Sequence, residues 1–177
     1  IPLINRRLEY FSADLSKLVN LSSLLENQGD VADLILISNK SPRDLISALN
    51  EIYIEQSNRN GNASFFDNYS ISNGLINFCT NYDYDSIYPS KSAVKSKEIK
   101  AMINRLLALK LIRFTRKQLT DTFSQTSNKS EGQINLMISY KLIKEEEILS
   151  KNNERVYEVI EPKVQFLIKR SVYSIEN

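Results

Sequence analysis

Residues 111–160 read LIRFTRKQLT DTFSQTSNKS EGQINLMISY KLIKEEEILS KNNERVYEVI, and the change of pattern within this stretch decides the fold. It opens with a short apolar segment at 111–114, which predicts a strand. A helix is expected over 116–123, and apolar residues mark a second helix over about 134–140. A polar turn at 126–130 separates these helices. The first part of the stretch therefore predicts strand, helix, turn and helix.

The rest of the stretch changes from a helical period to the alternation of a hairpin. Residues 142–149 become extended, and residues 155–160 alternate as a strand does. The intervening Lys151-Asn152-Asn153-Glu154 is typical of a turn. An amphipathic helix over 97–109 precedes this region, and a helix opening at Pro162 follows it. This order of elements is that of a winged helix, a helix-turn-helix followed by a two-stranded β-wing.

The sequence before this region predicts helices only. Leucines at helical spacing mark one over about 15–25, and Asp30 is placed to cap a second over 31–37. Ser41-Pro42-Arg43-Asp44 then has the residues of a helix start: a capping Ser, a Pro at the first helical position and an acid three residues after the cap. A fourth helix begins near residue 65 or 70 and ends near 79. The third helix is expected to bury a face formed by Leu45, Ile46, Leu49, Ile52 and Tyr53.

The chain therefore predicts a mainly α protein of two domains, a helical bundle over 1–88 and a winged-helix domain over 89–177. A polar stretch interrupts the helical pattern at the boundary, where Pro89 disfavours helix at the preceding residue. Residues 1–88 hold 6 Lys and Arg against 11 Asp and Glu, a net charge of −5; residues 89–177 hold 17 against 10, a net charge of +7. A basic second half attracts polyanions, although a solvated Lys-rich helical surface has the same composition.

Three tyrosines, Tyr82, Tyr84 and Tyr88, stand among acids just before this boundary. They have two interpretations: a docking patch for a partner, or aromatic residues that pack the linker onto a domain. Cys79, on an apolar face, is expected to be a small buried hydrophobe.

The residues that are missing exclude most catalytic chemistry. The chain has no His, and its single Cys79 cannot form a thiolate cluster, so we expect no metal site and no Ser-His-Asp triad. Its four glycines are too far apart for a phosphate-binding loop. The chain alone is therefore not expected to be an enzyme. No window approaches the roughly 18 apolar residues of a membrane helix, and no signal peptide opens the chain, so we expect a cytoplasmic protein without a membrane partner.

The run Ser41-Pro42-Arg43-Asp44-Leu45-Ile46, followed by Leu49-Asn50-Glu51-Ile52, resembles the lid of AAA+ and STAND-type P-loop ATPases. Arg6-Arg7-Leu8-Glu9-Tyr10 resembles the chain entering such a lid. Many of these ATPases continue into a winged helix, as the second half here does. The P-loop, the Walker B acid and the first sensor are absent. Because Ile1 is not an initiator Met, we expect a piece of a longer chain. The resemblance implies that its upstream part binds ATP and Mg²⁺, with no cofactor held by this piece.

The resemblance implies a role for Arg43 as the second sensor, which reaches the phosphates of the nucleotide when the lid closes. A guanidinium is always charged and presents a rigid donor fork that suits phosphate. The start of a helix also favours anions. The alternative is a solvated side chain of the first turn, or one paired with a neighbouring acid.

The winged helix has its own candidate contacts with double-stranded DNA. Helix-turn-helix proteins read base edges with the first turns of the second helix, and the helix before it often meets phosphates. The acids Glu131 and Glu145-Glu146-Glu147 oppose such binding, so we expect weak, salt-sensitive and largely non-specific association. The candidate residues are Arg116, Lys117, Asn128, Lys129, Ser130, Gln133, Asn135, Lys151 and Arg155.

Three functions remain open from the sequence. The first is the C-terminal regulatory part of a P-loop ATPase, in which the lid senses nucleotide and the winged helix binds DNA or docks a partner. The second is a transcriptional regulator whose helical half is an effector or dimerisation domain. The third is a module for protein interaction or self-association that never touches DNA.

Overall fold

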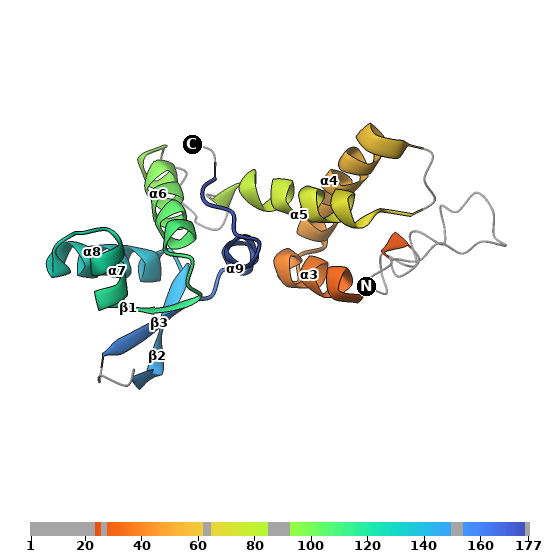
Figure 1. Cartoon of the computed structure of the whole chain (residues 1–177). Coiled ribbons are helices and arrows are strands. Elements are labelled where there is room, and N and C mark those ends of the chain that lie inside the picture. Colours follow the sequence, from red (N-terminus) through yellow and green to blue (C-terminus); the bar gives the residue numbers. More distant parts are fainter. Residues whose placement is uncertain (1–23, 26–27, 62–64, 85–92, 150–153, 176–177) are drawn as a thin grey trace. The chain divides into compact units, whose positions relative to one another are not determined.

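The computed structural model describes residues 24–25, 28–61, 65–84, 93–149 and 154–175 (Figure 1). This part of the chain is mainly helical and holds one small antiparallel sheet, which confirms the expected fold class at that level. The chain divides into two compact units, residues 1–78 and 79–177. The boundary predicted between 88 and 89, and most of the helix predicted over 15–25, lie outside the described residues. No helix among those described is long and apolar enough to span a membrane.

The first unit contains α3 (Gln28–Ser38), α4 (Pro42–Asn60) and most of α5 (Asn68–Thr80). The predicted start of α4 is confirmed, because Ser41 precedes it in an extended conformation and the Ser41 hydroxyl accepts a hydrogen bond from the Asp44 amide at 3.2 Å. The predicted cap of α3 is wrong. That helix begins at Gln28, so Asp30 lies inside its first turn. A carboxylate at this position still stabilises the helix, because it lies near the positive end of the helix dipole.

Helices α4 and α5 cross at Gly74 with their backbones almost in contact (Figure 1). A Cβ added at Gly74 would lie 2.5 Å from the Ile52 Cα, so only glycine fits there. The buried face of α4 is formed by Leu45, Ala48, Ile52 and Gln56. The face predicted for this helix is therefore wrong in part, because Ile46 and Tyr53 are exposed.

The second unit follows the order of elements expected from the sequence. Its three strands are β1 (Arg113–Thr115), β2 (Ile143–Leu149) and β3 (Arg155–Val159). They form an antiparallel sheet in the order β1-β3-β2, in which Phe114 lies opposite Tyr157 and Ile143 opposite Val159. The expected polar turn before the second helix is shorter than predicted, because that helix already begins at Ser127. Its helices are α6 (Ala93–Leu109), α7 (Arg116–Thr122), α8 (Ser127–Ser139) and α9 (Pro162–Lys169).

Two of the tyrosines before the predicted boundary, Tyr82 and Tyr84, pack against the start of α9, which agrees with the second of the two interpretations. Tyr88 lies outside the described residues. Tyr84 is buried, and its hydroxyl donates a hydrogen bond to the Cys79 carbonyl at 2.9 Å. The Tyr82 ring meets the Tyr84 ring edge-on at 5.2 Å and lies 4.0 Å from the Lys163 ammonium. Lys163 is itself buried beside Glu161, with 3.7 Å between Nζ and Oε1. The aromatic rings thus cover a buried ion pair.

Candidate nucleic-acid interface

The two helices that were predicted to meet DNA are both fixed at their N-termini by side chains. Thr115 caps α7 in a reciprocal capping box: its hydroxyl accepts from the Gln118 amide, and the Gln118 side chain accepts from the Thr115 amide. Thr126 caps α8 by accepting from the Lys129 amide. These local bonds set where each helix begins, and hence which residues stand in its first turn.

A partly buried cluster of polar side chains holds α7 against α8. The hydroxyls of Thr120 and Ser130 lie 2.8 Å apart, and the Gln125 amide donates to Ser130 at 2.9 Å and to the Gln133 carbonyl oxygen at 2.7 Å. Ser130 and Gln133 are 0% and 8% exposed. Both had been candidates for DNA contact, and the structure corrects this, because their side chains face α7 and not the solvent.

The opposite side of α8 is exposed and carries short polar side chains, and we refer to it as the α8 face. A Cβ added at Gly132 would meet nothing within 4 Å, so the helix backbone is open to solvent there. A ligand could therefore approach this helix closely. The α8 face consists of Ser127, Asn128, Glu131, Gly132 and Asn135.

The α8 face borders a groove of about 590 Å³ between α7, α8 and the β2–β3 hairpin. Tyr157 forms part of its wall and is nearly buried, with its ring 5.9 Å from that of Phe114. Burial, followed by the nearby Glu145 carboxylate, raises the pKa of Tyr157, so its phenol stays protonated. The groove is lined by Arg116, Lys117, Thr120, Ser127, Glu131, Ile134, Asn135, Ile138, Glu145, Glu154, Arg155 and Tyr157.

Two of the predicted cations in this groove are paired with carboxylates. Arg116 on α7 lies 3.2 Å from the Glu131 carboxylate on α8, and Arg155 on β3 lies 3.4 Å from the Glu145 carboxylate on β2. Lys117 and Lys129 are exposed, and no carboxylate of the described residues forms an ion pair with either. Lys151 lies outside the described residues. With three cations and three acids, the groove lining has no net charge.

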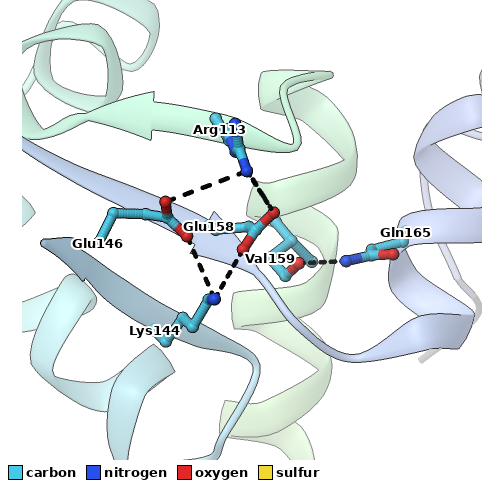
Figure 2. Close-up of polar contacts among 6 residues, drawn as sticks. All are labelled: Arg113, Lys144, Glu146, Glu158, Val159 and Gln165. Carbon is cyan, nitrogen blue, oxygen red and sulfur yellow. Dashed lines mark hydrogen bonds and ion pairs between the residues drawn. The ribbon is translucent and has the colours of Figure 1, made fainter. Parts of the chain in front are cut away.

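The other face of the sheet carries a second set of charges, which we refer to as the outer network. It consists of Arg113 on β1, Lys144 and Glu146 on β2, and Glu158 on β3 (Figure 2). Lys144 lies 3.0 Å from Glu158 and 3.2 Å from Glu146, and Arg113 lies 3.2 Å from Glu158. Hydrogen bonding from Lys144 lowers the pKa of Glu158, and the same contacts raise the pKa of Lys144. These charges neutralise one another at the sheet surface.

Arg43, the candidate for phosphate contact in the first unit, is exposed in the first turn of α4. No carboxylate among residues 28–61 and 65–84 forms an ion pair with it. The alternative in which Arg43 pairs with a neighbouring acid is therefore not seen in this part of the chain. No group of three acids or cysteines that could hold a metal ion is present in the described segments.

The ion pairs of the groove could not have been read from the sequence. Glu131 and Glu145 appeared there only as acids opposing DNA, and their partners lie 15 and 10 residues away on other elements. Ile138 and Tyr157 were likewise assigned only to the packing of a helix and a strand. The alternation in β3 does place Tyr157 on the same side as Arg155, which was the one available signal.

Comparison with known proteins gives no relative for this chain. No protein-family model matches it, nor does any curated protein or solved structure.

Proposed function

We propose that this chain is the lid and winged-helix part of a P-loop ATPase, with Arg43 contacting nucleotide phosphate and the second unit binding duplex DNA. The observation that supports the nucleotide role is the exposed position of the Arg43 side chain. The side chain is exposed, stands in the first turn of a helix capped by Ser41, and has no carboxylate partner among the described residues of its unit.

This arrangement suits phosphate for two physical reasons. A guanidinium without a carboxylate partner keeps its donor fork available for bidentate contact. The partial positive charge of the α4 N-terminus adds to the attraction for an anion. Asp44, whose amide donates to Ser41, belongs to the cap of the same helix.

Support for the winged helix comes from the order of α6, β1, α7, α8, β2 and β3 and from the central place of β3 in the sheet. In this proposal α8 is the recognition helix, and Asn128 and Asn135 on the α8 face are suited to pair with adenine edges in the major groove. Lys117 and Lys129 supply phosphate contacts. The small number of such cations gives weak binding, with a Kd on the order of 10⁻⁴–10⁻⁶ M at physiological salt.

The nucleotide role is tested in the full-length coding chain. We expect a G-x-x-x-x-G-K-[ST] segment between a strand and a helix before Ile1. Arg43→Ala should lower the rate of ATP hydrolysis with little loss of stability, since exposed substitutions usually stay within about 0.5 kcal/mol. Arg43→Lys should recover only part of the rate, because the bidentate geometry is lost. Ser57→Ala, an exposed change at the other end of α4, is the control.

Either of two results would contradict this assignment. One is a full-length chain without a P-loop. The other is an Arg43→Ala protein whose rate of hydrolysis equals that of the Ser57→Ala control.

The DNA role is tested by fluorescence-anisotropy titration of a labelled duplex at low and high salt. Lys117→Ala and Lys129→Ala should each weaken binding and reduce the salt slope, by about 0.9 for each phosphate that the variant no longer neutralises. Lys169→Ala, an exposed change on α9, should change neither. Absence of binding even at low salt would reject the DNA role and favour a protein-docking role for the same groove.

A further inference from the structure

Both ion pairs of the groove join different elements, and both are exposed to solvent. The Arg116 and Glu131 side chains are 50% and 59% exposed, and those of Arg155 and Glu145 are 69% and 43% exposed. Exposed pairs of this kind contribute only about 0.2–1 kcal/mol to stability, because water and salt screen them. The pairs can therefore open without disturbing the fold.

The position of these pairs gives them a consequence for binding. Arg116 and Arg155 line the same groove, one at the start of α7 and the other on the hairpin. Arg116 directly follows Thr115 of β1 and Arg155 directly precedes Val156 of β3. Thr115 and Val156 are paired in the sheet, so the two guanidinium groups start from neighbouring positions. In the proposed winged helix these elements, the helix before the recognition helix and the wing, are the ones that meet DNA phosphates. With Glu131 and Glu145 in place, each guanidinium already donates to a carboxylate, and a phosphate must compete with that carboxylate for it.

We infer that Glu131 and Glu145 are intramolecular competitors of DNA phosphate for Arg116 and Arg155, and so limit the affinity of this surface. The inference rests on the proposed DNA-binding function. Binding proceeds by replacing carboxylate with phosphate at each guanidinium, and the displaced carboxylates remain in the groove and repel the backbone. A protein whose arginines are paired in this way binds DNA weakly until one of the two carboxylates is neutralised or moves away from its arginine.

Removing the competitors has a calculable effect. Each additional phosphate that the protein neutralises adds to log K a term of about −0.9 times the logarithm of the salt concentration. At about 0.1 M salt, this term raises the binding constant K about 8-fold. Glu131→Gln and Glu145→Gln should each raise the affinity for duplex DNA up to about 8-fold, and the double variant up to about 60-fold. The salt slope should steepen by about 0.9 for each single change.

The matched control is Glu146→Gln, which makes the same change of net charge on the same strand. Its carboxylate belongs to the outer network with Arg113 and Lys144, on the other face of the sheet (Figure 2). The experiment titrates a labelled duplex with the 177-residue chain and each variant from about 50 to about 200 mM salt. Circular dichroism verifies that each variant is folded.

The possible outcomes separate the inference from the function on which it rests. Tighter binding and a steeper slope for the Glu131 and Glu145 variants, with little change for Glu146→Gln, supports the inference. Equal increases in affinity for all three variants would overturn it, since net charge alone would then explain them. If the wild type and all three variants bind DNA with the same affinity and the same salt slope, the inference is also overturned, but the DNA-binding function stands. Binding by none of them at the lowest salt would reject both.

Discussion

At the scale of single residues, two glycines make opposite contributions to stability. Gly74 stands where α5 crosses α4, and an added Cβ would lie within 2.9 Å of three backbone atoms of Glu51 and Ile52. Backbone atoms cannot rotate out of the way as the end of a side chain can. Gly74→Ala should therefore lower the free energy of unfolding by about 1–3 kcal/mol or more, measured by urea denaturation. Wild-type stability in this variant would show that the helices do not cross so closely.

Gly132 is the matched case, because it also lies within a helix but has open space around it. Alanine loses less backbone entropy than glycine on folding, and the backbone here has no positive φ to prevent the change. Gly132→Ala should raise the free energy of unfolding by about 0.5–1 kcal/mol. A loss of stability in the same urea titration would mean that α8 has close neighbours at this position.

Single residues also show what the sequence could and could not predict. Ser41 was correctly identified as a cap, because a cap depends on three or four neighbouring residues. Ser130 and Gln133 were assigned to the wrong side of α8, because their burial depends on Thr120 and Gln125 across the helix-turn-helix. A polar residue gives no local sign that its hydrogen-bond partner is another buried side chain.

At the scale of elements, the outer network ties the three strands together and makes their stability depend on pH. The pKa of Glu158 is lowered in the folded protein, chiefly by Lys144, so the folded state binds this proton less readily than the unfolded state. Its contribution to stability is therefore complete above the usual glutamate pKa of about 4.3 and is lost as the pH falls below that value.

Glu158→Gln should remove this dependence. We expect the variant to be less stable than the wild type at about pH 7 and the difference to shrink toward about pH 3, in urea midpoints followed by circular dichroism. Parallel loss of stability in both proteins across this range would contradict the assigned role of the Glu158 carboxylate.

The elements themselves were predicted well wherever the periodicity was strong. The strands and helices of the second unit appear in the expected order, and α7, α8 and α9 each begin at a capping residue. The buried face of α4 was predicted less well. This buried face includes the small Ala48 and the polar Gln56. The Gln56 side chain accepts a hydrogen bond from the backbone amide of Asp67. Apolar periodicity alone cannot detect such positions, so exposed Ile46 and Tyr53 were taken as buried.

At the scale of the whole molecule, the net charge of a region proved a poor guide to its local charge. Residues 89–177 carry a net charge of +7, yet the groove that would face DNA has three cations and three acids in its lining. The excess of Lys and Arg stands elsewhere, including exposed positions on α6 and α9. The sequence could give the sum of charges, but only the fold determines which of them meet.

Binding of duplex DNA by the second unit through the α8 face, as proposed above, can be tested by nuclear magnetic resonance. A heteronuclear spectrum of the ¹⁵N-labelled chain would be recorded at low salt during titration with a short duplex. We predict that the amide signals of Asn128, Gly132 and Asn135 shift most, while those of Lys144 and Glu146 in the outer network do not shift. Signals that do not move, or shifts confined to the outer network or to the first unit, would contradict it.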